Sequence, residues 1–298
     1  MPQLGIGQTA FSMTPIGVFD SGFGGLSIFR EIHRLLPQYD YIFLGDNARA
    51  PYGDRTFDEV FRFTRQAVLR LFEMGCPLVI LACNTASAKA LRNIQQQVLP
   101  GLDDPTRRVL GVIRPTVERV GNLTYNGHVG LVATRATVSS LSYDMELAKV
   151  GGITLTSQAC PRWVPLIESG RLHDEVLYNE VKSDLEQLFR TDPEIDTIIL
   201  GCTHYPLITS VIQQVLLDLD HPEVILMPQG KSVSYSLRDY LHRHPEMESR
   251  LSRTPSSAEN TTEGTTQFFT TGDVASFEQL ATLFLGHNEQ IKANRILL

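Results

Sequence analysis

Two cysteines lie in segments of similar pattern. Cys83 follows the apolar run LVILA at 78–82, and Cys202 follows TIILG at 197–201. In both segments a small residue precedes the cysteine, two polar residues follow it, and a helical pattern comes next. Ligands of open α/β sheets bind beyond the carboxyl ends of the strands, where both turns would lie. We therefore expect two similar half-structures, each of which contributes one thiol to a common cleft.

A pair of opposed thiols suits the inversion of a stereocentre. One thiol removes a proton from one face of a carbon atom, and the other returns a proton to the opposite face. The amide N–H groups and the dipole of a helix N-terminus favour a thiolate, so Cys83 and Cys202 are predicted bases or nucleophiles. The alternative is a chance match of two buried strands, because a free cysteine is more often a small apolar core residue. Cys76 and Cys160, each followed by proline, are predicted to be such packing residues.

His204 leaves two other kinds of site open around Cys202. A cysteine beside a histidine is typical of acyl transfer through a thioester. Cys83, Cys202 and His204 are also conceivable zinc ligands, although a Cys-x-His spacing suits zinc poorly and no metal is predicted. The four cysteines form no Cys-x-x-Cys pair of the zinc or redox type.

Polar turns follow three further predicted strands. The glycine-rich turn DSGFGGLS at 20–27 fails the dinucleotide pattern G-x-G-x-x-G, because Ser27 stands where the third glycine is needed. Its backbone N–H groups at a helix start would suit a carboxylate or a phosphate, and Asp20 could meet an ammonium group or orient a thiol. The turns at 45–53 and 133–137 could line the same cleft, although most such loops only connect elements.

Short apolar runs alternate with helical patterns, which favours an α/β fold with a largely parallel sheet. Strands are predicted near 16–19, 41–44, 78–82, 109–113, 129–132, 153–156, 197–200, 224–227 and 268–270. A capping box from Thr56 to Glu59 opens a predicted helix that ends at Gly75, and a second helix is predicted over about 172–189. The segment 245–266, rich in Ser, Thr, Glu and Pro, is expected to be an exposed, mobile loop.

Length, charge and composition argue against several classes of protein, namely disulfide scaffolds, nucleic-acid binders and membrane-spanning proteins. A chain of 298 residues suggests about two domains, and four cysteines are too few for a disulfide scaffold. The net charge of −7 argues against an electrostatic grip on nucleic acid or acidic lipid. No apolar stretch reaches the roughly 18 residues of a membrane span, and residues 1–15 carry no signal-peptide pattern. We expect a cytoplasmic protein with reduced thiols.

Six segments at predicted strand ends carry a further resemblance: DSGFGGLS at 20–27, PYG at 51–53, ACNTAS at 82–87, VATRAT at 132–137, CPRWVPLIESG at 160–170 and GCTHYPL at 201–207. In their order and spacing, from about residue 15 to 286, they closely resemble the glutamate racemases of the aspartate/glutamate racemase superfamily. Aspartate racemases are similar in general plan, but they usually carry glutamate at the position of His204 and lack the DSG opening.

The resemblance implies an isomerase that interconverts L- and D-glutamate without a cofactor, with D-glutamate feeding peptidoglycan synthesis. Cys83 and Cys202 match the family's two catalytic thiols. Asp20 and His204 match the groups proposed to assist them, and Glu168 matches an acidic residue near the second thiol. The positions that match substrate-binding residues are Asp20, Ser21, Tyr52, Gly53, Asn84, Thr85, Thr134, Thr137, Thr203 and His204.

The resemblance also implies a fold and partners. Two pseudo-symmetric α/β domains with mainly parallel sheets are expected, formed by residues 1–112 with 222–298 and by residues 113–221, with the active site in the cleft between them. The expected partners are the glutamate substrate and a second copy of the chain in a homodimer, with no nucleic acid and no membrane.

Two segments depart from the family pattern. IRPT at 113–116 has Thr116 where glycine commonly follows the proline, and MPQGK at 227–231 replaces a frequent Asp-Ser or Asp-Pro turn. Neither is expected to touch a catalytic match, and they leave effector response and dimer contacts open. The alternatives are a racemase or isomerase of aspartate or another small acid, a Cys-His acyl hydrolase, and a non-enzymatic inhibitor of DNA gyrase.

Overall fold

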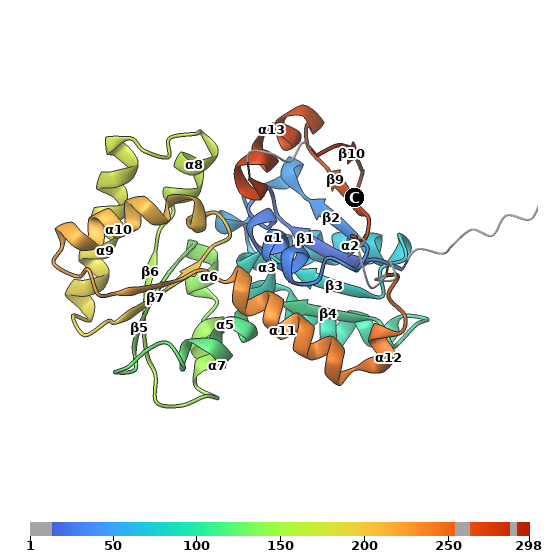
Figure 1. Cartoon of the computed structure of the whole chain (residues 1–298), viewed down its shortest axis with the longest axis horizontal. Coiled ribbons are helices and arrows are strands. Elements are labelled where there is room, and N and C mark those ends of the chain that lie inside the picture. Colours follow the sequence, from blue (N-terminus) through green and yellow to red (C-terminus); the bar gives the residue numbers. More distant parts are fainter. Residues whose placement is uncertain (1–13, 254–262, 287–290) are drawn as a thin grey trace, which may run out of the picture.

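The strands form two separate parallel sheets (Figure 1). The computed structural model describes residues 14–253, 263–286 and 291–298. In the first sheet the strand order is β10 (Ala293–Arg295), β9 (Thr266–Thr270), β2 (Tyr41–Gly45), β1 (Ile16–Asp20), β3 (Leu78–Leu81) and β4 (Arg108–Gly111). In the second sheet it is β6 (Thr154–Ala159), β5 (His128–Ala133), β7 (Thr197–Gly201) and β8 (Ile225–Met227). Every neighbouring pair is parallel, so the predicted fold class is confirmed.

Helices connect the strands of each sheet. The first half contains α1 (Leu26–Leu35), α2 (Phe57–Glu73), α3 (Asn84–Lys89), α4 (Leu91–Asn93), α11 (Gly230–Arg243), α12 (Pro245–Glu248) and α13 (Val274–Leu285), with the short helices η1 (Asn47–Arg49), η2 (Tyr52–Asp54), η3 (Ile94–Val98) and η4 (Leu99–Gly101). The second half contains α5 (Ile113–Val120), α6 (Arg135–Ser139), α7 (Ser142–Leu147), α8 (Trp163–Glu168), α9 (Glu175–Thr191), α10 (Thr209–Asp218) and the short helix η5 (Tyr205–Ile208). No helix in the described ranges is long and apolar enough to cross a membrane.

Helices bury both faces of each sheet. In β1, Ile16 packs into the core beside α1, α11 and α13, whereas Phe19 packs into the core beside α2 and α3. In β7, Ile198 packs with α9 and α10, whereas its neighbour Ile199 packs with α5 and α7 on the opposite face (Figure 1). Because successive side chains point to opposite faces, a strand covered on both sides needs a continuous apolar run, which is the pattern that the sequence shows.

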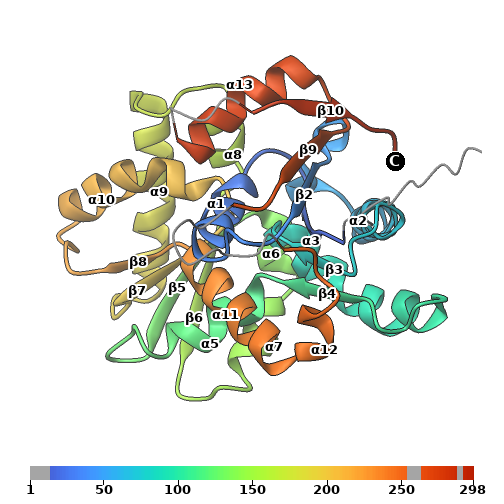
Figure 2. The ribbon, with the colours of Figure 1, turned by 45° about the vertical axis from the view of Figure 1, so that its right-hand side comes forward.

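Most predicted elements are confirmed, with small shifts of their ends. Thr56 and Glu59 form the predicted capping box of α2, since the Thr56 hydroxyl accepts from the Glu59 backbone N–H and the Glu59 carboxylate accepts from the Thr56 N–H. β4 ends at Gly111 and not at Ile113, because Ile113 is already the first residue of α5. The sequence missed the three-residue edge strand β10, which extends the first sheet beyond β9 beneath α13 (Figure 2).

The expectation of one exposed loop over 245–266 is wrong in its described part. Residues 245–248 form α12, and Thr266 already belongs to β9. Met247 and Leu251 are buried in the core that contains α1 and α11. Their spacing of four residues places them on one side of a helical turn, so a polar segment still contributes two core side chains. Residues 254–262 lie outside the described residues.

The chain passes twice between the halves. The first passage follows β4, since Val112 packs with the first sheet and Ile113 with the second. The predicted return near residue 222 is too early, because β8 pairs with β7 in the second sheet. The second passage therefore follows Met227, and Val233 in α11 again packs with the first sheet.

Burial of Met247 predicts that α12 stabilises the fold. Met247→Ala should lower the free energy of unfolding by about 2–4 kcal/mol, because it removes a buried side chain and leaves a cavity. Met145→Ala is the matched control, since Met145 is exposed and should change stability by less than about 0.5 kcal/mol. Urea unfolding followed by circular dichroism measures both. Equal effects would show that α12 does not pack on the core.

Candidate active site

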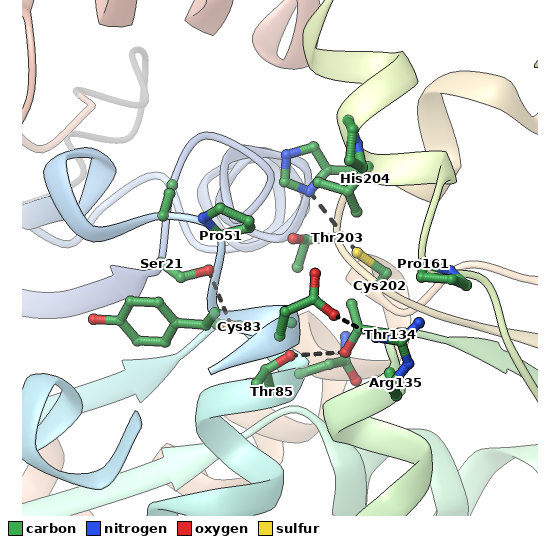
Figure 3. Close-up of a pocket in the computed structure, with 18 of the residues that line it drawn as sticks. Ser21, Pro51, Cys83, Thr85, Thr134, Arg135, Pro161, Cys202, Thr203 and His204 are labelled. Atoms are coloured by element: carbon green, nitrogen blue, oxygen red, sulfur yellow. Dashed lines mark hydrogen bonds and ion pairs between the residues drawn. The ribbon is translucent and has the colours of Figure 1, made fainter. Parts of the chain in front are cut away.

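The turns at the carboxyl ends of the two sheets enclose one cavity (Figure 3). The first half contributes the turn after β1, the segment at 50–54 and the start of α3 after β3. The second half contributes the turns after β5, β6 and β7. The lining residues are Ser21, Gly22, Ala50, Pro51, Tyr52, Gly53, Asp54, Cys83, Asn84, Thr85, Thr134, Arg135, Cys160, Pro161, Val164, Pro165, Glu168, Cys202, Thr203 and His204. The structure therefore brings Cys83 and Cys202 from different sheets to the wall of one cavity.

Cys83 is the N-cap residue of α3. Its Sγ accepts from the Ala86 backbone N–H at 3.4 Å and lies 3.3 Å from the Ser21 hydroxyl (Figure 3). Burial, together with the charge of the neighbouring Asp20 carboxylate, nevertheless raises the pKa of the Cys83 thiol to about 12. The Ala86 N–H at the helix N-terminus favours a thiolate, as expected, but the loss of water outweighs the hydrogen bonds that Cys83 accepts, so its pKa is raised on balance.

Asp20 lies behind Cys83 at the end of β1 and is fully buried. Its Oδ2 accepts from the Gly22 N–H at 2.8 Å, whereas Oδ1 has no partner among the described residues. Burial raises the pKa of the Asp20 carboxyl, although His204 and the Gly22 and Gly25 N–H groups act in the opposite direction. A buried acceptor without a donor is costly, so Oδ1 of Asp20 is an unsatisfied group behind the cavity wall.

Cys202 is joined to a histidine and a carboxylate. The Cys202 Sγ lies 3.8 Å from Nδ1 of His204, and Nε2 of His204 lies 3.0 Å from Oε1 of Glu168 at the end of α8. Burial opposes the charged imidazole, but the hydrogen bonds to Cys202 and Glu168 outweigh it and raise the pKa of His204 to about 10. His204 is therefore protonated at neutral pH and donates from both ring nitrogens.

Three threonine hydroxyls from both halves meet beside the thiols. Thr85 Oγ1 lies 3.0 Å from Thr134 Oγ1 and 3.3 Å from Thr137 Oγ1, and the last two lie 3.0 Å apart. Thr134 also caps α6 by accepting from the Thr137 N–H at 3.3 Å. Thr85 and Thr134 line the cavity, so this cluster presents hydroxyl donors that suit a carboxylate.

Comparison with known proteins identifies the family. The family model described as Asp/Glu/Hydantoin racemase matches residues 16–225. The chain belongs to this family. A curated glutamate racemase from Cereibacter sphaeroides is 41% identical over 282 residues, which cover 91% of this chain and 96% of that protein.

Solved racemase structures have the same fold as this family member. A glutamate racemase isoform from Bacillus anthracis has a TM-score of 0.82 at 32% identity, covering 96% of this chain and 98% of that one. A glutamate racemase from Francisella tularensis, solved in complex with D-glutamate, has a TM-score of 0.80 at 30% identity with the same coverage. The resemblance stated from the six segments is thereby confirmed.

Most predicted site residues of this racemase-family chain reach the cavity wall, but three act differently from expectation. Asp20 and Thr137 are buried and do not line the cavity, but each lies next to residues that do. Tyr52 lines the cavity, yet its hydroxyl donates to the buried carboxylate of Asp46, which also accepts from Arg49 and Thr271. The Tyr52 hydroxyl is therefore committed to the protein and not to a ligand.

Sequence reasoning missed an ion pair in the racemase cavity. Arg135 Nη1 lies 3.2 Å from Asp54 Oδ1, and the two residues come from opposite halves. Both stand inside or beside motifs that the sequence displayed, Arg135 within VATRAT and Asp54 directly after PYG. Cys160, predicted only as a packing residue, also lies in the wall. No group of three or more potential metal ligands occurs in the described part of the chain.

The Glu168–His204 pair predicts a pH-dependent stability for this racemase-family chain. The pKa of His204 is raised from 6.5 to about 10, so the protonated pair contributes stability that is fully present below about pH 6.5 and lost as the pH rises through about 10. Glu168→Gln should therefore lower the free energy of unfolding at pH 6 and change it little above pH 10.

Urea unfolding at both pH values measures this effect. The matched control is Glu223→Gln, because Glu223 lies 3.9 Å from the more exposed His221. The control should show a smaller pH dependence, since exposed ion pairs contribute little. A Glu168→Gln effect that is the same at pH 6 and above pH 10 would contradict the charged pair.

Proposed function

We propose that this chain is a glutamate racemase that uses Cys83 and Cys202 as two opposed acid/base groups and needs no cofactor. The observation that carries the proposal is that two thiols, one from each half of the molecule, line the same cavity. Relatives that carry the name glutamate racemase cover nearly the whole chain, and a similar structure was solved with D-glutamate.

The proposed reaction moves one proton off the α-carbon and another onto it. For one enantiomer, the thiolate of one cysteine takes the α-proton while the thiol of the other delivers its proton to the opposite face. The bonding electrons of the C–H bond remain on carbon between these events, so the cavity must stabilise carbanion character without bulk water. After one turnover the two cysteines have exchanged protonation states, and the product enantiomer is the substrate of the new state.

The two thiols have different neighbours. Near Cys83, burial and the Asp20 charge hold the proton on sulfur. Near Cys202, the protonated His204 donates a hydrogen bond and balances negative charge, and Glu168 holds the ring in place. In this proposal the ammonium group of glutamate lies on the cavity side of Asp20, where its positive charge offsets the negative charge that opposes a Cys83 thiolate.

The remaining predicted residues, together with Arg135, supply donors for the two carboxylates of glutamate. In this proposal the carboxylates bind to side-chain hydroxyls, to an amide and to one positive charge. These groups belong to Ser21, Thr85, Thr134 and Thr203, to Asn84, and to Arg135. Thr137 orients Thr85 and Thr134 from behind, and Gly53 lets the wall approach Thr134. D-Glutamate made here would serve peptidoglycan synthesis.

Substitution of each thiol tests the mechanism. Cys83→Ser and Cys202→Ser should each lower the rate of racemisation at least about 10³-fold in both directions, because a hydroxyl is a far weaker acid than a thiol. Chiral chromatography of L- and D-glutamate incubations under reducing conditions measures the rate. Cys76→Ala is the control, since Cys76 is buried away from the cavity and should keep full activity.

The same incubation in D₂O separates the alternatives. Wild-type protein should exchange the α-proton of glutamate for deuterium, seen by proton NMR, and should act on glutamate faster than on aspartate. If the protein racemised aspartate but not glutamate, aspartate would be its substrate and the proposal would be wrong. A trapped thioester at Cys202 without α-proton exchange would favour the Cys-His acyl hydrolase instead.

We also infer a homodimer in the cytoplasm, with the two sheets as two domains. The four cysteines are free, which fits a reducing compartment. The pairing of β8 with β7 supports a second domain boundary after residue 227 in place of 222. Sedimentation equilibrium should give about twice the mass of one chain, and a mass of 33.3 kDa would contradict the dimer.

A further inference from the structure

Four buried side chains form a closed set of hydrogen bonds behind the cavity, here termed the Gln229 network: Asn84, Thr116, Tyr143 and Gln229. Asn84 Nδ2 donates to Gln229 Oε1 at 2.5 Å, and Gln229 Nε2 donates to Tyr143 Oη at 2.7 Å. Tyr143 in turn donates to Asn84 Oδ1 at 2.8 Å, which closes the ring. Gln229 Nε2 also donates to Thr116 Oγ1 at 2.8 Å. None of the four residues is more than 3% exposed.

The direction of every bond in the Gln229 network follows from one backbone carbonyl. The Thr116 hydroxyl donates to the Val112 carbonyl oxygen at 2.8 Å, and a carbonyl can only accept. Thr116 Oγ1 must therefore accept from Gln229, which places Nε2 on that side and turns Oε1 toward Asn84. Asn84 then has to present its NH₂ group to Gln229 and its oxygen to Tyr143. The orientation of the Asn84 amide is thus fixed from outside the cavity.

Asn84 connects the Gln229 network to the cavity. It directly follows Cys83 at the start of α3 and lines the cavity wall. Its NH₂ group has two hydrogens, of which Gln229 takes one, and the second has no acceptor within the described residues. A flipped amide would bring its oxygen against Gln229 Oε1 and its NH₂ group against the Tyr143 hydroxyl, and it would lose the bond to Gln229. The direction of the free N–H of Asn84 therefore depends on Gln229.

We propose that Gln229 is a positioning residue for the racemase reaction, which fixes the Asn84 amide so that its free N–H binds a carboxylate of the substrate. The inference rests on the proposed function. The two segments that depart from the family pattern, 113–116 and 227–231, thus meet each other through Thr116 and Gln229, and Gln229 contacts Asn84, a predicted substrate-binding residue. A buried network that is fully satisfied holds one arrangement, and loss of one member leaves the others unsatisfied.

Steady-state kinetics of glutamate racemisation test the role. Gln229→Leu keeps the approximate volume but removes both the acceptor and the donors, so KM for both enantiomers should rise about ten- to fifty-fold while kcat changes less than about threefold. Thr116→Val removes the hydroxyl that accepts from Gln229 and donates to the Val112 carbonyl but leaves Gln229 in place, and it should raise KM about two- to five-fold. Gln95→Leu is the matched control, because Gln95 makes a single hydrogen bond to the Val109 carbonyl away from the cavity and should leave KM unchanged.

A double-mutant cycle separates positioning from simple destabilisation. In an Asn84→Ala background, Gln229→Leu should have little further effect on KM, because no amide remains to be oriented. Multiplication of the two single effects would overturn the proposal, as would an unchanged KM in Gln229→Leu. If Gln229→Leu does not fold in a thermal melt, the cycle is run with Thr116→Val under the same criteria. An inactive wild-type protein would instead refute the proposed function.

Discussion

The cavity depends on how closely the two halves approach each other. At Gly24 a Cβ atom would lie 2.3 Å from Thr203 Oγ1 and 2.5 Å from His204 Nδ1, and at Gly53 it would lie 3.1 Å from Thr134 Cβ. Glycine is therefore required at Gly24, where any side chain would push the halves apart. The Ser27 hydroxyl, which donates to the Thr203 carbonyl at 2.8 Å, holds the same contact. The threonine cluster and the placing of both thiols follow from this approach.

Similar turns in the two halves produce chemically different thiols. The turn after β3 leads into a helix whose N–H reaches Cys83, yet the fully buried Asp20 stands beside it. The turn after β7 leads into the short helix η5, and His204 replaces backbone donors as the main partner of Cys202. The two halves have similar turns, but Cys83 has an acidic neighbour, Asp20, and Cys202 has a basic neighbour, His204. The two thiols therefore differ in their hydrogen-bond partners, although they occupy corresponding places in the two halves.

The fold and the thiols were predictable because both leave a local trace in the sequence. Strands buried on both faces give continuous apolar runs, and a parallel sheet collects the residues that follow them at one edge. The raised pKa of Cys83 was not predictable, since its burial among the side chains of several strands and helices leaves no local trace in the sequence. Met247 in a polar segment and Gln229 after β8 also escaped, because the apolar and polar partners that give them a role include residues far away in the chain.

The Gln229 network has a mechanical meaning as well as a chemical one. Val112 and Thr116 stand at the first passage of the chain between the halves, and Gln229 stands at the second. The two backbone connections between the halves are therefore joined to each other by the hydrogen bond from Gln229 to Thr116. All other links between the halves are non-covalent, including the Asp54–Arg135 ion pair. The two places where the backbone joins the halves thus act as a single connection, which ties the end of β4 and the end of β8 to each other.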